Sequence, residues 1–361
     1  MPMTYRLYES QVEDLRGTIY GPASPDFHPE IASSTLRKAL EGGIQTDDDK
    51  IISTILEHDN FQRQKIIGAY SDMYKRNLLC DLQEETGGYF YEMVEALFIP
   101  AHTYSAMLIY EAITNRNANK AVAVEVICTR TAVQMKVVCE AYLEKYRIAM
   151  EKDMEIKVDG TYGRMLRALL KHPRVDNQIE IDLPLANKQV SIIQQQVSGP
   201  EEIGRNVELF IELFAGHSWT QIAAFLQRFK AQDQHHRSLQ SYVKYDKDLH
   251  ADIQKMLLVI LKIAQNEQLY FAEKLYNAIT GADIDHQTII RICVTRSEID
   301  LADICEIYEK KYKRCLQNDV RQTCAGEYAR LLLRLINCNC KINAHETIAE
   351  EIDSSLVNNN A

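Results

Sequence analysis

Residues that interrupt helices are scarce in this sequence: among its 361 residues, 8 are proline and 14 are glycine. Long stretches of the chain can therefore be helical. No run of 18 or more apolar residues occurs, which excludes a membrane-spanning helix. The first ten residues, MPMTYRLYES, have neither the basic nor the apolar region of a signal peptide, so we expect a cytoplasmic protein.

Positive charge is also in deficit. The 41 lysines and arginines are outnumbered by 51 aspartates and glutamates, which gives a formal net charge of -10 at pH 7. A nucleic-acid-binding protein needs a concentrated positive surface, so this class is excluded. Direct electrostatic binding to an anionic lipid surface is excluded for the same reason, and any membrane role would require a bridging cation.

The nine cysteines are odd in number and lie mostly within helix-like patterns, so we interpret them as reduced thiols. Cys338 and Cys340 have the spacing of half a metal site, but no matching second pair is present. We interpret them as two thiols near the end of the sequence. A phosphate-binding loop of the G-x-x-x-x-G-K type and a recurring nucleophile–base spacing are absent as well. We therefore predict that the protein is not an enzyme.

What the sequence does contain is an internal repeat. The windows 51–98, 123–170 and 289–336 align without a gap, and a fourth window, 210–261, aligns after a short insertion. The alignment has three aromatic columns: Tyr70, Tyr142, Tyr308 and Phe229; Tyr74, Tyr146 and Tyr312; and Phe90, Tyr162 and Tyr328. The second column follows the first by one helical turn, so the two columns lie on one helix face.

The apolar residues within a copy are three and four positions apart, as in IIRICV (289–294) and IDLADICEIY (299–308). This spacing indicates helices rather than strands. Polar turns divide each copy into a series of short helices. We therefore predict an all-α protein whose aromatic columns are core residues that pack one helix on the next, rather than ligand-binding residues.

Three stretches of the sequence resemble the annexin family. The stretch TLRKALEGGIQTDDDKIISTILEHDNFQRQKIIGAYSDMYKRNLLCDL resembles the first annexin repeat, and TIIRICVTRSEIDLADI resembles the fourth, in which RSEID is typical. LRGTI, at 15–19, resembles the segment that precedes repeat I, and the similarity extends over residues 13–338. The resemblance implies an annexin-like, right-handed array of four five-helix repeats that forms a curved disc.

The resemblance also implies a division of the chain. We expect an N-terminal tail (1–31), repeat I (32–102), repeat II (103–171), a linker (172–184), repeat III (185–264), repeat IV (265–338) and a C-terminal extension (339–361). The linker would join two halves, of which one contains repeats I and II and the other contains repeats III and IV. Tails of this family bind protein partners or lie on the concave face of the disc.

The function that the resemblance implies is calcium-dependent binding to acidic phospholipid membranes, as a peripheral scaffold that can associate with itself on the membrane. In the family, a G-x-G-T loop supplies main-chain carbonyls, and a carboxylate about 40 residues later completes the calcium site. This chemistry suits calcium, which prefers six to eight oxygen ligands. The alternative is a structural or adaptor protein that has lost most calcium sites and binds cytoskeletal or other protein partners.

In repeat I, the resemblance assigns Glu41, Gly43, Gln45 and Glu85 to a calcium site, with Ile44 as a membrane-contacting tip. Gln45 stands where the family has its second glycine, and a side chain resists the backbone conformation that glycine adopts there. Glu85 lies 40 residues beyond Gln45, where the carboxylate is required. A weakened site is therefore expected.

The same loop, EGGIQTDDDK, also has a simpler interpretation as the beginning of a helix. Thr46 would be the N-cap residue, and Asp49, three residues later, would be its carboxylate partner. The sequence leaves both interpretations open.

In repeat III, the stretch SGPEEIGRN assigns Gly199, Glu202 and Gly204 to a calcium site with Ile203 as its tip. The carboxylate is Asp248 when the alignment is counted back from KMLLVIL and Asp246 when it is counted forward from RSLQSYV. The alternative is that DKDLHAD is only a polar turn that caps a helix.

The other two repeats depart further from the pattern. In repeat II the carboxylate position is Lys157, so we interpret the calcium site as lost. The alternative is a displaced ligand, Asp159, two residues later. Lys157 itself has a simpler interpretation as a solvated surface lysine. In repeat IV the carboxylate position is Thr323, and Gly281 remains as a weak calcium candidate. Calcium is the one cofactor that we expect.

Overall fold

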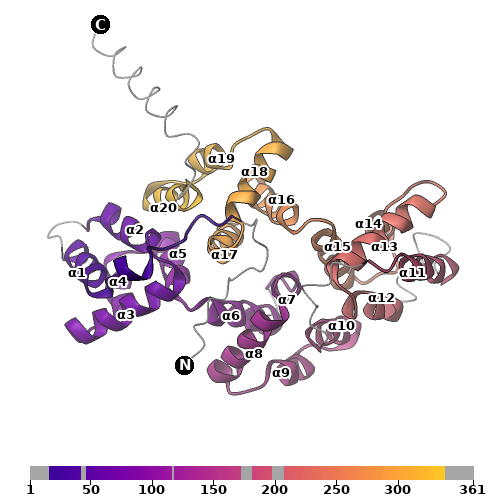
Figure 1. Ribbon diagram of the computed structural model, residues 1–361, viewed down its shortest axis with the longest axis horizontal. Helices are drawn as coiled ribbons and strands as arrows, with labels where there is room; N and C mark the ends of the chain where they lie inside the picture. The colour runs from indigo at the N-terminus through magenta and orange to yellow at the C-terminus, as the bar shows by residue number, and fades with distance from the viewer. Residues whose placement is uncertain (1–15, 42–45, 116–117, 172–180, 197–206, 338–361) are drawn as a thin grey trace, which may run out of the picture. The chain divides into compact units, whose positions relative to one another are not determined.

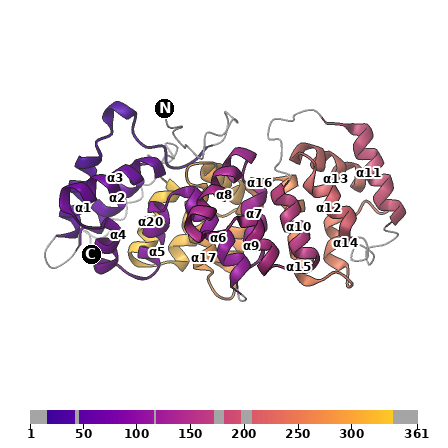
Figure 2. The same cartoon turned by 90° about the horizontal axis from the view of Figure 1, so that it is seen from below.

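The computed structural model describes residues 16–41, 46–115, 118–171, 181–196 and 207–337 (Figure 1). Within these ranges it contains twenty α-helices, one 3-10 helix (Ser24–Asp26) and no strand. Figure 2 shows the same helices from a second direction, and in the coloured parts of the chain short connections join them. The prediction of an all-α protein is confirmed. Among the described residues, no helix is both long enough and apolar enough to cross a membrane.

The helices form four successive sets of five, which we call repeats I to IV, and the five helices of each set are helix A to helix E. Repeat I contains α1 (Pro29–Leu40), α2 (Asp48–Leu56), α3 (Asn60–Tyr74), α4 (Leu78–Glu85) and α5 (Gly88–Phe98). Repeat II contains α6 (Ala101–Thr114), α7 (Ala121–Cys128), α8 (Ala132–Tyr146), α9 (Met150–Lys157) and α10 (Gly160–Lys171). Repeat III contains α11 (Leu183–Gln196), α12 (Val207–Ala215), α13 (Trp219–Gln232), α14 (Leu239–Tyr245) and α15 (Ala251–Gln265). Repeat IV contains α16 (Glu267–Thr280), α17 (His286–Arg296), α18 (Leu301–Tyr312), α19 (Leu316–Thr323) and α20 (Gly326–Asn337).

The first aromatic column forms the core of the repeats. Tyr70, Tyr142 and Tyr308 are fully buried, and Phe229 is 3% exposed. Each of the three tyrosines donates a hydrogen bond to a buried aspartate of helix D, over 2.6 Å to Asp81, 2.5 Å to Asp153 and 2.6 Å to Asp319. The prediction that this column is core is therefore confirmed, and a buried tyrosine–aspartate pair recurs in three repeats.

Helix B of repeat I begins one residue later than its sequence suggests. Asp47 is the N-cap residue of α2, and its side chain accepts a hydrogen bond from Lys50 N. Thr46 instead donates its hydroxyl to Asp48 over 2.8 Å. The expectation of a Thr46 cap with Asp49 as its partner is wrong, because an aspartate next to the first turn accepts the free backbone N–H better than the threonine hydroxyl does.

The repeats pair in an order that differs from the order of the sequence. The described residues up to Ile99, together with those from Ala272 onward, form one compact unit, and Pro100–Phe271 form a second. Repeat I therefore groups with repeat IV, and repeat II groups with repeat III. The expected halves, I with II and III with IV, are wrong, because helices that are distant in sequence bury their apolar faces together. Examples are α5 with α17 in the first unit and α7 with α15 in the second.

The RSEID stretch (296–300) contributes to the interior of the first unit. Arg296 and Asp300, 2% and 0% exposed, form a buried ion pair. The carbonyl of Ser297 accepts hydrogen bonds from the backbone N–H groups of Thr18 and Ile19 over 2.6 and 3.0 Å. The segment 16–20 is thus fixed to repeat IV, although the sequence placed it in an N-terminal tail. Residues 1–15 lie outside the described part of the chain.

Candidate functional site

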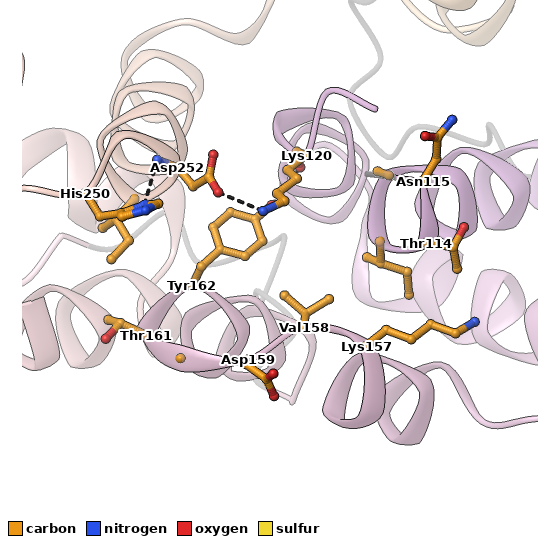
Figure 3. Close-up of a pocket in the computed structure, with 14 residues that line it drawn as sticks. Thr114, Asn115, Lys120, Lys157, Val158, Asp159, Thr161, Tyr162, His250 and Asp252 are labelled. Carbon is orange, nitrogen blue, oxygen red and sulfur yellow. Dashed lines mark hydrogen bonds and ion pairs between the residues drawn. The ribbon is translucent and has the colours of Figure 1, made fainter. Parts of the chain in front are cut away.

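Two connections of repeat II lie beside each other, although they are far apart in the sequence. A cavity of about 710 Å³ is lined by Asn115 and Lys120, which flank the loop between helices A and B (the A–B loop). It is also lined by 157–162, the connection between helices D and E (the D–E corner), and by His250 and Asp252 of repeat III (Figure 3). Lys157 therefore lines the same cavity as Asn115 and Lys120, which flank the A–B loop.

The D–E corner has the same geometry in repeats I, II and IV. Helix D ends at Glu85, Lys157 and Thr323, respectively. Helix E then begins at a glycine with a positive φ angle: Gly88 (φ 56), Gly160 (φ 69) and Gly326 (φ 63). Positive φ is unfavourable for residues with a Cβ atom, so glycine is required at this bend. The last residue of helix D therefore occupies an equivalent place in the three repeats.

In repeat I that place is taken by a solvent-exposed carboxylate, Glu85. Glu41, at the other connection, follows α1 and forms an ion pair with Arg37. Arg37 also reaches Asp81 over 3.2 Å, which ties the end of helix A to helix D one turn before Glu85. This contact holds helix D, of which Glu85 is the last residue, against the end of helix A, after which the A–B loop begins. Gly43, Ile44 and Gln45 lie outside the described residues.

In repeat II the last residue of helix D is Lys157, and its ammonium contacts a carboxylate and an aromatic ring. The ammonium of Lys157 lies 2.8 Å from a carboxylate oxygen of Asp153 and 4.4 Å from the centre of the Tyr110 ring. Its side chain is 30% exposed. Lys157 lies at the surface, but its ammonium is paired, because a buried carboxylate and an aromatic face both attract its charge.

The opposite wall of the repeat II cavity carries a second ion pair. Lys120 lies between Asp252 and the ring of Tyr162, with its ammonium 2.7 Å from Asp252, whereas Lys157 lies on the side of Thr114 (Figure 3). The hydrogen bond from Lys120 holds the pKa of Asp252 below its usual range. Each lysine that lines the cavity therefore already has a carboxylate partner, and the cavity does not present two free positive charges.

In repeat IV the place is taken by Thr323, whose hydroxyl donates a hydrogen bond to the carbonyl of Asp319 over 2.8 Å. Gly281 begins the A–B loop of this repeat, and its N–H donates to Asn277 O over 3.1 Å. The loop closes with a hydrogen bond from Asp285 N to Ala278 O. This arrangement keeps the loop compact but provides no carboxylate at the end of helix D.

The connection between helices C and D has six residues in repeat III and three in the other repeats, and the connection between helices D and E has five residues instead of two. Counted from helix D, the carboxylate is Asp246, which is 4% exposed and accepts a hydrogen bond from Asp248 N over 2.8 Å. Counted from helix E, it is Asp248, which is exposed to solvent. Because the extra residues lie on both sides of helix D, counting from helix D and counting from helix E lead to different carboxylates. Gly199, Glu202, Ile203 and Gly204 lie outside the described residues.

Two exposed apolar residues next to these corners were not anticipated. Ile156, the residue before Lys157, is 60% exposed, and Tyr245, the last residue of α14, is 63% exposed. Both belong to the second unit, and Tyr245 precedes Asp246, which is the carboxylate position of repeat III when it is counted from helix D. An isolated apolar residue among polar ones, as in MEIK and VKYDKD, is the signal that would have identified them.

Known proteins share both the sequence pattern and the fold. A sequence model described as Annexin matches residues 31–97, 104–169 and 270–335. Human annexin A5 is 30% identical over 321 residues, which cover 89% of this chain and 97% of that protein. This chain belongs to the annexin family. Human annexin A7 is 31% identical over 339 residues, or 88% of this annexin and 68% of the relative. The solved structure of annexin III superimposes with a TM-score of 0.80 at 28% identity, over 89% of this annexin and 97% of that chain.

Annexins in general bind calcium and phospholipid and are binding proteins rather than enzymes. The donor set of this annexin fits calcium unequally at its four corners. Glu85 and Asp248 are exposed carboxylates, which suit calcium, whereas Lys157 and Thr323 supply no anionic oxygen. The described residues contain no group of three His, Cys, Asp or Glu side chains that could hold a metal ion. Main-chain carbonyls would therefore have to supply most of the ligands.

Proposed function

We propose that this annexin binds acidic phospholipid membranes through calcium ions held at repeats I and III, as a peripheral scaffold. The observation that carries the proposal is the exposed carboxylate of Glu85 at the end of helix D, in the place where Lys157 of repeat II lines a cavity together with the residues that flank the A–B loop. A calcium ion at such a corner would be held by this carboxylate and by loop carbonyls, and its remaining positions would take water and a lipid phosphoryl oxygen.

Charge supports a bridging ion as the means of attachment. The chain has a net charge of -10, so an acidic membrane repels it unless cations intervene. Because repeats I and III belong to different compact units, attachment through them would use both units of the molecule. Two sites on one chain give a steeper calcium response than a single site, since the second contact forms at a high effective concentration.

The test is co-sedimentation with phosphatidylserine vesicles over a calcium series, followed by addition of a chelator. We expect binding that requires calcium and that the chelator reverses. Glu85→Gln should raise the half-maximal calcium concentration about tenfold, which corresponds to about 1.4 kcal/mol. Glu84→Gln is the matched control, because Glu84 is exposed on the same helix and forms an ion pair with Arg76.

Binding that is indifferent to calcium, or no binding at millimolar calcium, would exclude this function. The second result would favour the adaptor alternative, in which the helical scaffold binds cytoskeletal or other protein partners. The predicted roles of Ile44 and Ile203 as membrane-contacting tips stay predictions. Their joint replacement by serine should weaken vesicle binding at fixed calcium and leave the melting temperature unchanged.

A further inference from the structure

Each repeat has a residue with positive φ after helix C, and the side chain that follows it differs in only one repeat. The positive-φ residues are Lys75, Arg147, His236 and Lys313. The residues that follow them are Arg76, Ile148, Arg237 and Arg314. An arginine therefore stands at this position in repeats I, III and IV, and an isoleucine stands there in repeat II.

In the three repeats with an arginine, its guanidinium neutralises a buried aspartate. Arg76 Nη2 lies 2.7 Å from Asp81, which is 4% exposed. Arg314 Nη2 lies 2.5 Å from Asp319, which is 1% exposed. A buried carboxylate is costly unless a cation and hydrogen bonds compensate for the loss of water, which explains why the arginine is present.

In repeat III an arginine also neutralises a buried aspartate, but here the aspartate follows helix C and the tyrosine lies on helix D. Arg237 Nε lies 3.3 Å from Asp233, which follows helix C, and the tyrosine that donates to this aspartate, Tyr242, comes from helix D. The aspartate is 8% exposed. An arginine from the connection between helices C and D thus accompanies a buried aspartate in every repeat except repeat II.

Repeat II has the buried aspartate but lacks the arginine. Asp153 is 2% exposed and accepts hydrogen bonds from the hydroxyl of Tyr142 and the ammonium of Lys157. Lys157 is the one described cation in an ion pair with this carboxylate. It comes from the end of helix D, which is the carboxylate position of a calcium corner. The positive charge that repeats I, III and IV place before helix D is therefore placed at the end of helix D in repeat II.

We infer that Ile148 and Lys157 together determine the cation preference of repeat II: without an arginine at 148, Asp153 requires Lys157, and a fixed ammonium replaces the calcium-binding carboxylate. The calcium part of this inference rests on the proposed function, whereas the charge-balance part does not. A single exchange of Lys157 for glutamate would leave two carboxylates one helical turn apart without a cation. An arginine at 148 would recreate the arrangement of Arg76, Asp81 and Glu85.

The charge balance is tested by thermal unfolding of the full chain in chelator, which removes calcium from the comparison. Lys157→Glu should lower the melting temperature by about 5 °C or more, because the buried carboxylate of Asp153 loses its cation. Ile148→Arg combined with Lys157→Glu should restore it. The matched control is Thr323→Glu, which introduces a glutamate at the same position of repeat IV, where Arg314 already pairs with Asp319. That variant should melt within about 2 °C of the parent.

Two results would contradict the proposed charge balance. One is an unchanged melting temperature for Lys157→Glu. The other is a melting temperature that Lys157→Glu lowers equally with and without Ile148→Arg. If Lys157→Glu does not fold, Lys157→Gln, which removes the cation without adding a charge, provides the same comparison against its own Ile148→Arg partner.

The calcium part is tested with phosphatidylserine vesicles and the stable double variant. We expect its half-maximal calcium concentration for binding to fall at least about threefold below that of Ile148→Arg alone. An unchanged value, with a restored melting temperature, would overturn the assignment of cation preference to this pair. If the parent chain itself shows no calcium-dependent binding, the proposed function fails, and the melting series still decides the charge balance.

Discussion

Arg63 Nη2 lies 2.8 Å from Glu298 Oε1, and this contact joins helix C of repeat I to repeat IV. Arg63 is 1% exposed, and it also donates hydrogen bonds to the carbonyls of Ile55, His58 and Leu97. Glu298 accepts a second hydrogen bond, from Asn60 N over 2.8 Å. Burial raises the pKa of Glu298, and the charge of Arg63 opposes that shift.

The two sides of this contact should therefore respond differently to mutation. Arg63→Met removes one donor from each of three carbonyls and one carboxylate and should lower the free energy of unfolding by about 3–5 kcal/mol. Glu298→Gln keeps an acceptor for Arg63 and should cost about 1–2 kcal/mol. Urea denaturation measures both values. Equal losses for the two variants would show that the carboxylate charge, rather than the network of arginine donors, stabilises this contact.

Acid should weaken repeat I through Asp81. The hydrogen bonds from Arg76 hold the pKa of Asp81 below its usual range, against the effect of burial, and Tyr70 and Arg37 act in the same direction. A lowered pKa in the folded state contributes stability that is present above the unfolded pKa of about 4 and is lost as the pH falls. Arg76→Gln should therefore shift the acid loss of stability to a higher pH.

The measurement for Asp81 is the free energy of unfolding from urea series between pH 3 and pH 7. Lys75→Gln removes the same charge from the neighbouring residue and should leave the pH profile of the parent unchanged. An identical profile for Arg76→Gln and Lys75→Gln would contradict the specific role of Arg76.

Of the two candidate carboxylates of repeat III, we expect Asp246 to stabilise the fold and Asp248 to bind calcium. Asp246 is buried and accepts the N–H of Asp248, so Asp246→Ala should lower the free energy of unfolding by about 1 kcal/mol. Asp248 is exposed, so Asp248→Asn should raise the calcium requirement for vesicle binding and leave the melting temperature unchanged. A higher calcium requirement for Asp246→Asn alone, at unchanged stability, would reverse this assignment.

Ile156 and Tyr245 should contribute apolar contacts to membrane binding. They are 60% and 63% exposed beside the D–E corners of repeats II and III, and a buried apolar side chain contributes about 1.5–3 kcal/mol at most. Replacing both by serine should weaken vesicle binding about tenfold at fixed calcium, with an unchanged melting temperature. Val133→Ser is the matched control, because Val133 is 74% exposed but lies on helix C, away from the corners. Equal losses for the control and the double variant would contradict a specific contact.

The class of fold and the repeating core were determined by the sequence. Helical spacing and the aligned Tyr70, Tyr142 and Tyr308 predict short helices packed on one another, because these patterns are local and each repeat presents them again. The relation between an A–B loop and a position about 40 residues later came from the family resemblance, and it could be applied to each of repeats I, II and IV because their sequences align without a gap. Where repeat III inserts residues on both sides of helix D, the count became ambiguous between Asp246 and Asp248.

Only the tertiary structure decided which residues balance each other's charge and which repeats pack together. No local pattern relates Arg63 to Glu298, 235 residues later, or groups repeat I with repeat IV. No sequence pattern distinguishes Lys157 from a lysine without an ion-pair partner, because its role depends on the burial of Asp153 and on the isoleucine at 148. Burial sets the cost of an unpaired charge, and burial is a property of the packed chain rather than of any single stretch of residues.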